Sequence, residues 1–358
     1  MNVTGNDFRG NEIIHNIQTV ASILAIFMNL FLCFVIKRYS RAEFGNYKYL
    51  MLIFAIFGVY YAIIEIIILP NMFDWGHTKC FFPTSFIRHY KYASAIACLY
   101  PAAYAMSMVL IAMHFIYRFF TLCKLQWMYW FDYPYCFIWV IAFVLYSINY
   151  WASVYFGYQP DRESIESVRE PIAEAFQVNV DEIHLMTLKY FTETPTGLVP
   201  RWKDLGVCVD MLFLVAIVVS IILYFCYKIH TTLKQNVQMI SEKTKRLQIQ
   251  LFKALFCQTI VPLATGFGPV SVFYFAPFVG WNLGKYTSII CVFMSFYPLC
   301  DPIVVLFMIP DYRRAVIRMI TRRRIHRGIS STHNETSLGG VTSRNLSGIM
   351  HNQQSSRY

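Results

Sequence analysis

The apolar residues of this chain are gathered into seven blocks of about 20 residues or more, and most polar residues lie between the blocks. A helix rises about 1.5 Å per residue, so a block of this length crosses a hydrocarbon layer about 30 Å thick. Soluble cores seldom contain even one uninterrupted apolar run of this length. The pattern therefore predicts an all-α membrane protein with seven spans, at about residues 13–36, 47–69, 92–117, 133–156, 205–227, 250–276 and 286–309.

The segments outside the seven-helix domain, residues 13–309, differ in character. Residues 1–12 are not basic, and no cleavage site of small residues follows the first block, so we expect that block to remain as a membrane anchor. Residues 157–204 are acidic and partly amphipathic, which predicts one or two short helices over the outer mouth of the bundle. Residues 323–358 are rich in Ser, Asn, Gly and Arg, which is typical of a disordered tail.

Composition and charge support a membrane setting and give the chain a direction. Hydrophobic residues make up 57% of the chain and charged residues 14%, whereas a soluble domain has about 25% charged residues. About two-thirds of the 31 Lys and Arg follow the first, third, fifth and seventh blocks. Because cytoplasmic loops carry an excess of Lys and Arg, we expect the N-terminus outside and the C-terminus inside. The net charge of +11 is then an orientation signal, and no nucleic-acid partner is expected.

Modification and metal sites give little further information. The sequon that begins at Asn2 falls on the predicted outer side and is a candidate for glycosylation. The ten cysteines show no metal-ligand spacing, and no cofactor is predicted. Only Cys80 and Cys98 fall near the outer face, so they are the one candidate disulfide pair.

Few ionisable residues fall within the spans, and this bears on function. They are Glu65, His114, Asp210 and Asp301. Channels and transporters usually carry several such groups at mid-membrane, so this pattern disfavours them. Glu65 and Asp210 lie about one turn from an outer end, where snorkelling to water and contact with a ligand are both open interpretations. A membrane-embedded enzyme has no support, since no HExxH motif, no catalytic pairing of intramembrane aspartates and no nucleophile–base pair stands out.

The third span ends in a candidate switch. His114 and Arg118 are four residues apart and share a helix face, with Arg118 at the cytoplasmic boundary. A snorkelling arginine is one interpretation. The other is a charge that neighbouring helices hold at rest and release to a partner on activation.

The last two spans carry features that break or soften helices. Pro262 and Pro269 predict a kink in the sixth span, and hence a hinge. Asp301 needs a partner or a proton, and Pro302 frees a backbone carbonyl one turn earlier. Residues 310–322 then predict an amphipathic helix on the cytoplasmic leaflet, with Tyr312 on its apolar stripe and Arg313 off that stripe.

Together these motifs resemble the nematode seven-transmembrane serpentine chemoreceptors of the Str family. The resemblance runs through nearly the whole chain. It is carried by GNYKYLMLIFAIF in the second span, HFIYRF at the end of the third, the long acidic loop, QTIVPL in the sixth and PLCDPIVVLFMIPDYRRAV at the end. It implies a G-protein-coupled olfactory receptor for sensory perception of chemicals, in the plasma membrane and specifically in the cilium of sensory neurons. The implied partners are a small odorant, a heterotrimeric G protein, the lipid membrane, and an arrestin or kinase on the tail.

The resemblance also assigns roles and shows two departures. Tyr117 and Arg118 take the place of the G-protein-facing motif, and Asp301 with Pro302 takes the place of the switch in the seventh span. The segment 157–204 has no cysteine for the usual clamp to the third span, and Tyr117 stands where an acidic residue would precede the arginine. Any lock on Arg118 must therefore come from elsewhere, with Asp301 or aromatic neighbours as candidates.

The predicted ligand site lies among the outer halves of the helices. Tyr100, Tyr104 and Ser107 share a face of the third span and are candidates for its lining, although aromatic residues at this spacing also serve packing alone. The competing function is a ligand-gated channel or transporter. It would give current or flux without a G protein, and it would need a continuous polar stripe that the spans lack.

Overall fold

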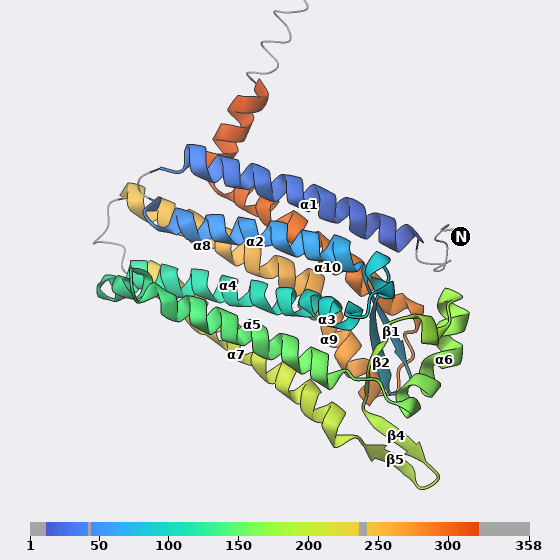
Figure 1. Ribbon diagram of the computed structural model, residues 1–358. Helices are drawn as coiled ribbons and strands as arrows, with labels where there is room; N and C mark the ends of the chain where they lie inside the picture. Colours follow the sequence, from blue (N-terminus) through green and yellow to red (C-terminus); the bar gives the residue numbers. More distant parts are fainter. Residues whose placement is uncertain (1–11, 42–43, 236–241, 322–358) are drawn as a thin grey trace, which may run out of the picture. The chain divides into compact units, whose positions relative to one another are not determined.

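The computed structural model describes residues 12–41, 44–235 and 242–321. The described residues divide into two units, with the division between Arg313 and Arg314. The first unit confirms seven helices of membrane-spanning length and apolarity, which run side by side (Figure 1). They are Glu12–Tyr39, Tyr47–Ile68, Ala93–Cys123, Cys136–Gly157, Trp202–Lys234, Arg246–Phe278 and Lys285–Met308.

The helices of the first two spans are α1 (Glu12–Tyr39) and α2 (Tyr47–Ile68). The third span begins with α3 (Ala93–Ala97) and continues as α4 (Leu99–Cys123). The fourth and fifth spans are α5 (Cys136–Gly157) and α7 (Trp202–Gln235). The sixth contains α8 (Glu242–Pro262), the π-turn η5 (Leu263–Phe267) and α9 (Gly268–Phe275), and α10 (Ser288–Met308) forms the seventh.

The third span lies at the centre of the bundle. In its most apolar stretch 72% of the residues are buried, compared with 11% in the fourth span. It contacts α2, α5, α7 and α8, whereas α5 exposes most of its side chains to the surroundings. Residues on α4 can therefore contact most of the other helices, which makes α4 the natural carrier of a site.

Strands and a helix cover one end of the bundle, here called the strand end (Figure 1). The strands β1 (Pro70–Trp75), β2 (Thr78–Pro83) and β3 (Met186–Lys189) form an antiparallel sheet in that order. The helix α6 (Arg162–Phe176) packs on this sheet, and a second hairpin joins β4 (Phe191–Thr194) to β5 (Gly197–Pro200). The predicted short helix in 157–204 is thus present, but the strands were not predicted from the sequence.

The two faces of the β1–β2 hairpin look in opposite directions. Phe73, Cys80 and Phe82 join the cluster formed with α6, whereas Met72 and Phe81 join the core of the helical bundle. Successive side chains of a strand alternate between faces, so both faces of this hairpin are covered. Gly76, with φ of +58°, begins its two-residue turn. Because both faces are buried, the hairpin has no polar alternation to reveal it in the sequence.

The candidate disulfide is not formed. Cys80 and Cys98 are both free thiols, buried in different clusters. Residues 310–321 are helical, as expected for the segment after the seventh span. Asn2 and the tail 323–358 lie outside the described residues.

A single amide ties three helices together. Pro302 has no backbone N–H, so the carbonyl of Pro298, four residues earlier, lacks its helical donor. Asn29 of α1 donates its Nδ2 to that carbonyl at 2.8 Å, and also to the Ala25 carbonyl at 2.8 Å. Gly58 of α2 lies directly against the Asn29 amide, because a Cβ at Gly58 would stand 2.5 Å from Asn29 Oδ1. The small residue thus allows α2 to close over the contact between α1 and α10.

We expect Gly58→Ala to lower the thermal stability of the purified protein. The added methyl group displaces the Asn29 amide and leaves the Pro298 carbonyl unpaired, which costs about 1–3 kcal/mol. The matched control is Gly206→Ala in α7, where nothing lies within 4 Å of the added Cβ. Thermal unfolding in detergent checks this, and equal Tm values for the two variants would contradict it.

Candidate functional site

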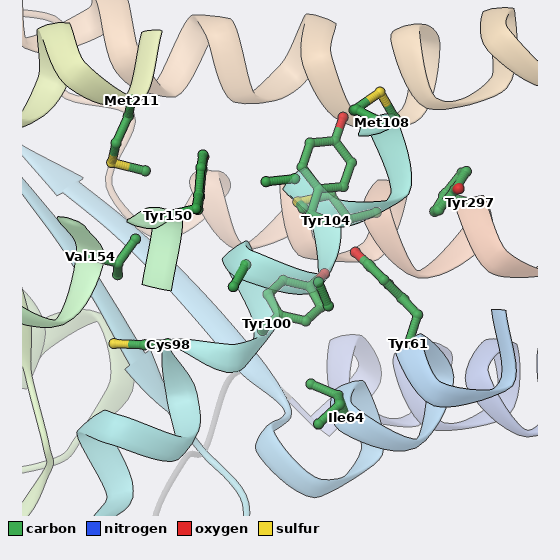
Figure 2. Packing of buried hydrophobic residues seen from close by; sticks show 14 of the residues in the cluster. Tyr61, Ile64, Cys98, Tyr100, Tyr104, Met108, Tyr150, Val154, Met211 and Tyr297 are labelled. Atoms are coloured by element: carbon green, nitrogen blue, oxygen red, sulfur yellow. The ribbon is translucent and has the colours of Figure 1, made fainter. Parts of the chain in front are cut away.

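An aromatic cavity lies near the strand end, between the helices and the β1–β2 hairpin. Its volume is about 110 Å³. Figure 2 shows part of its wall, with Tyr100 and Tyr104 of α4 close to Tyr150, Val154 and Met211. The complete lining is Met72, Phe81, Tyr100, Pro101, Tyr104, Tyr150, Val154, Tyr158, Met211, Leu212, Val215, Phe267, Val270, Ser271, Phe273, Tyr274 and Met294. Such a wall suits a small, mainly apolar molecule.

Tyr104 joins the cavity to the broken sixth helix. Its hydroxyl donates to the carbonyl of Pro262 at 3.2 Å, where α8 ends and the π-turn begins. A Cβ at Gly266 would lie 2.0 Å from that hydroxyl, so the contact requires glycine. The cavity wall therefore contacts one of the two predicted hinge prolines, Pro262, although the hinge motion itself stays a prediction.

Two of the five predicted ligand residues line the cavity, namely Tyr100 and Tyr104. The others lie elsewhere among the described residues. The hydroxyl of Ser107 donates to the Tyr104 carbonyl at 2.6 Å, within α4. Glu65 is fully buried and accepts a hydrogen bond from Ser295 of α10, and Asp210 accepts one from Ser153 of α5 at 2.6 Å.

Arg118 is buried near the end of α4 that lies opposite the strand end, here called the Arg118 end. Only 2% of its surface is exposed. Its Nη1 donates to Gln248 Oε1 of α8 at 2.8 Å, and its guanidinium carbon lies 3.5 Å from the centre of the Tyr47 ring. Nε and Nη2 have no hydrogen-bond partner among the described residues. A cation on a ring face with one neutral acceptor is held, but two of its three nitrogens stay available as donors.

Two further residues of the predicted switch complete the aromatic surroundings of Tyr47. The ring of His114 packs edge-on to Tyr47 at 5.6 Å, and the ring of Tyr117 lies 5.5 Å from it. His114 Nδ1 donates to the Leu110 carbonyl at 2.8 Å. Of the two sources considered for a lock on Arg118, the contacts favour the aromatic neighbours over Asp301.

Asp301 has a different partner. It is 3% exposed, and both of its carboxylate oxygens accept from Gln258 Nε2 of α8, at 3.0 and 3.1 Å. This meets the requirement that a buried carboxylate be hydrogen-bonded. Pro302 follows directly and frees the Pro298 carbonyl described above.

The last two predicted switch residues lie just after α10. Tyr312 is fully buried, stacks on Phe44 with ring centres 5.8 Å apart, and shares a 2.7 Å hydrogen bond with Ser40. Burial raises the pKa of Tyr312 to about 12, so its hydroxyl stays protonated at neutral pH. Arg313 is exposed.

One helix therefore connects the two candidate regions. Along α8, Gln248 holds Arg118, Gln258 holds Asp301, and the Pro262 carbonyl receives Tyr104. The first and last of these residues are about 21 Å apart along the helix at 1.5 Å per residue. Sequence reasoning missed Tyr47, Gln248 and Gln258, because neutral polar and aromatic residues give no charge signal. For the two glutamines, the only clue in the sequence was that they are polar residues within the sixth span.

Comparison with known proteins agrees with this architecture. The family model for serpentine type 7TM GPCR chemoreceptors of the Str group matches residues 14–317. Serpentine receptor class r-10 of Caenorhabditis elegans is 30% identical over 84% of this chain and 89% of its own, and the receptor of that name in Caenorhabditis briggsae is 30% identical over 83% and 87%. The C. elegans G-protein coupled receptor str-33 is 24% identical over 86% and 91%. The crystal structure of squid rhodopsin matches with a TM-score of 0.57 at 12% identity, covering 88% of this chain and 82% of that chain.

These comparisons define the class of the protein as a seven-helix receptor of the GPCR type. The chain belongs to the Str family of serpentine chemoreceptors, since the family model covers most of its length. It is a multi-pass membrane receptor and not an enzyme. The resemblance inferred from the motifs is thereby confirmed.

We expect Gly266→Ala to destabilise the receptor by about 1–3 kcal/mol, because the methyl group overlaps Tyr104. The control is Gly268→Ala, where the nearest heavy atom would be 3.4 Å from the added Cβ, an ordinary contact. Adding Tyr104→Leu to Gly266→Ala should recover part of the loss, since it removes the overlapping ring. Thermal unfolding of the wild type, Gly266→Ala, Gly268→Ala, Tyr104→Leu and the double variant checks this, and strictly additive losses from the two single changes would contradict the contact.

Proposed function

We propose that this receptor binds a small odorant or other environmental chemical in the aromatic cavity and activates a heterotrimeric G protein from the Arg118 end. The observation that carries the proposal is the hydrogen bond from Tyr104, in the cavity wall, to the Pro262 carbonyl at the break in the sixth helix. A ligand that moves Tyr104 acts directly on the helix that holds Arg118.

The cavity limits the size and chemistry of the ligand. A cavity of about 150 Å³ with apolar walls can hold benzene, and this one measures about 110 Å³. A molecule of at most about six non-hydrogen atoms is therefore the size that fits without rearrangement. The tyrosine hydroxyls that line the wall supply a few polar contacts to select among such molecules.

The Arg118 end supports coupling through its incomplete hydrogen bonding. Arg118 is held by one amide oxygen and one ring face, and its other donors are unmet among the described residues. A shift of α8 that takes Gln248 away would free the guanidinium for a partner. A ligand drives such a shift only through its different affinity for the two states.

Orientation and location complete the proposal. The excess of Lys and Arg in the connections at the Arg118 end supports placing that end in the cytoplasm and the N-terminus outside. Membership of a chemoreceptor family supports a role in chemical sensing, with the ciliary membrane of sensory neurons as the proposed site. Glycosylation at Asn2 and arrestin or kinase contacts on the tail involve residues outside those described.

The test is a screen of volatile chemicals on cells that express the full chain, with calcium as the readout. A response that a G-protein blocker abolishes supports the proposal. A ligand-gated current that persists under the blocker would instead support the channel alternative and overturn the receptor mechanism.

We expect Arg118→Ala to abolish the G-protein signal while leaving surface delivery intact, because the proposed contact with the G protein is lost. Arg162→Ala is the control, since Arg162 is an exposed residue of α6 at the strand end. Surface labelling and calcium responses measure the two effects together. Normal signalling by a well-expressed Arg118→Ala receptor would defeat this assignment.

Tyr47→Leu should raise the signal measured without ligand, because the ring face that holds Arg118 is gone. The lost cation–π contact amounts to about 1–2 kcal/mol, or a shift of about 5- to 30-fold in the resting equilibrium. Tyr47→Phe keeps the ring and should behave more like the wild type. Tyr49→Leu is the matched control, since that side chain on the same helix is 56% exposed. Equal basal signals in the Tyr47→Leu and Tyr49→Leu receptors would rule out the proposed hold.

A further inference from the structure

Lys79 of β2 is buried beside the cavity without a hydrogen-bond partner. The residue is fully buried, and its Nζ has no acceptor among the described residues. Three rings surround the amine, with their centres 4.7 Å (Tyr190), 5.3 Å (Phe273) and 3.5 Å (Tyr274) from Nζ. An aromatic box holds a cation but satisfies none of its N–H donors.

The register of the hairpin places this amine next to the ligand cavity. Side chains two residues apart on a strand share a face, so Lys79 lies on the same face as Phe81, which lines the cavity. On the paired strand Asp74 stands opposite Lys79, and Met72, two residues earlier, also lines the cavity. Phe273 and Tyr274 belong both to the box and to the cavity wall. One layer of rings therefore separates the amine from the cavity.

The separating ring is held by few polar contacts. The hydroxyl of Tyr274 shares a 2.9 Å hydrogen bond with Tyr158 and lies 3.6 Å from the sulfur of Met211. Both neighbours line the cavity as well. Rotation of Tyr274 would break its hydrogen bond to Tyr158 and open a path from the cavity to Lys79. A ligand group that hydrogen-bonds Tyr158 or Lys79 would compensate for the broken bond.

We propose that Lys79 binds the acidic end of a small carboxylic acid whose apolar part occupies the aromatic cavity. This inference rests on the receptor function proposed above and names the ligand class of that cavity. The carboxylate accepts hydrogen bonds from the Lys79 ammonium, and the alkyl chain packs against the tyrosine-rich wall. Charge-assisted hydrogen bonds of this kind are among the strongest in proteins, which makes the pair selective for acids over neutral isosteres.

The pKa values of Lys79 and Asp74 are compatible with a carboxylate bound to the Lys79 ammonium. Burial lowers the pKa of Lys79 to about 7, and the nearby Asp74 opposes the shift. Burial also raises the pKa of Asp74 to about 7, against a hydrogen bond from the Leu283 N–H and the charge of Lys79. A ligand that enters as the neutral acid can therefore transfer its proton to the neutral amine, leaving a carboxylate and an ammonium. Asp74 in its neutral form does not repel the anion.

The test compares acids with ketones of the same size on the full chain purified in lipid nanodiscs. The probes are the straight-chain acids from ethanoate to hexanoate and, for butanoate, the isosteric ketone pentan-2-one. Ligand-observed NMR gives the ratio of the two dissociation constants. We expect butanoate to bind at least about tenfold more tightly than pentan-2-one, and Lys79→Met to reduce that ratio by at least about tenfold.

Lys189→Met provides the matched control. Lys189 lies on β3 of the same sheet and pairs with Glu163 at 3.0 Å, so its loss should leave the ratio unchanged. Lys79→Met should not lower the Tm, because it removes a buried amine that has no hydrogen-bond acceptor among the described residues. A lower Tm together with equal weakening of both ligands would give Lys79 a purely structural role and overturn the proposal.

The remaining outcomes separate this inference from the receptor function. If the wild-type chain binds no acid, or binds acids no better than ketones, the Lys79 proposal fails while signalling to neutral odorants can still hold. If acids bind through Lys79 but no chemical raises a G-protein signal in cells, the proposed function fails and the acid site stands.

Discussion

Inside an apolar bundle each buried polar group needs a partner, and this constraint fixes how the helices of the receptor meet. The carbonyl that Pro302 frees is met by Asn29, and the carboxylate of Asp301 is met by Gln258. Each partner comes from a different helix, so satisfying the group also aligns two spans. Removing such an acceptor leaves its donor without a hydrogen bond in a low-dielectric region. The desolvation penalty of that donor exceeds the net free energy that the hydrogen bond contributes.

The same constraint explains why α8 can serve as a connecting element. Two of its polar side chains each hydrogen-bond a buried charged group on another helix: Gln248 accepts from Arg118, and Gln258 donates to Asp301. At the break, the Pro262 carbonyl meets Tyr104. A displacement of the helix therefore changes several hydrogen bonds at once. Such a set favours two discrete arrangements over gradual deformation, which is what a switch needs.

The sequence predicted the spans well because apolar runs of membrane length have few alternative explanations. It also singled out Asp301, Pro302 and Arg118, since charges are rare inside spans and a proline removes a backbone donor. Their partners were not predictable: Gln248 and Tyr47 are ordinary residues whose roles come from packing between helices distant in sequence. The hairpin that carries Lys79 was missed because both of its faces are covered, which removes the alternation that marks a strand.

The strength of the contacts around Arg118 matches the size of the ligand proposed above. A molecule of about six non-hydrogen atoms gains at most about 9 kcal/mol on binding, and only the difference between two states shifts their populations. Reversing a ratio of about 1:99 needs about 5.5 kcal/mol. Breaking a buried arginine–carboxylate pair would cost about 3–5 kcal/mol, and the ligand would have to supply this from its difference in affinity for the two states. One neutral amide and one ring face hold Arg118 far more weakly, so Tyr117 in the position of an acid suits the proposed switching by small molecules.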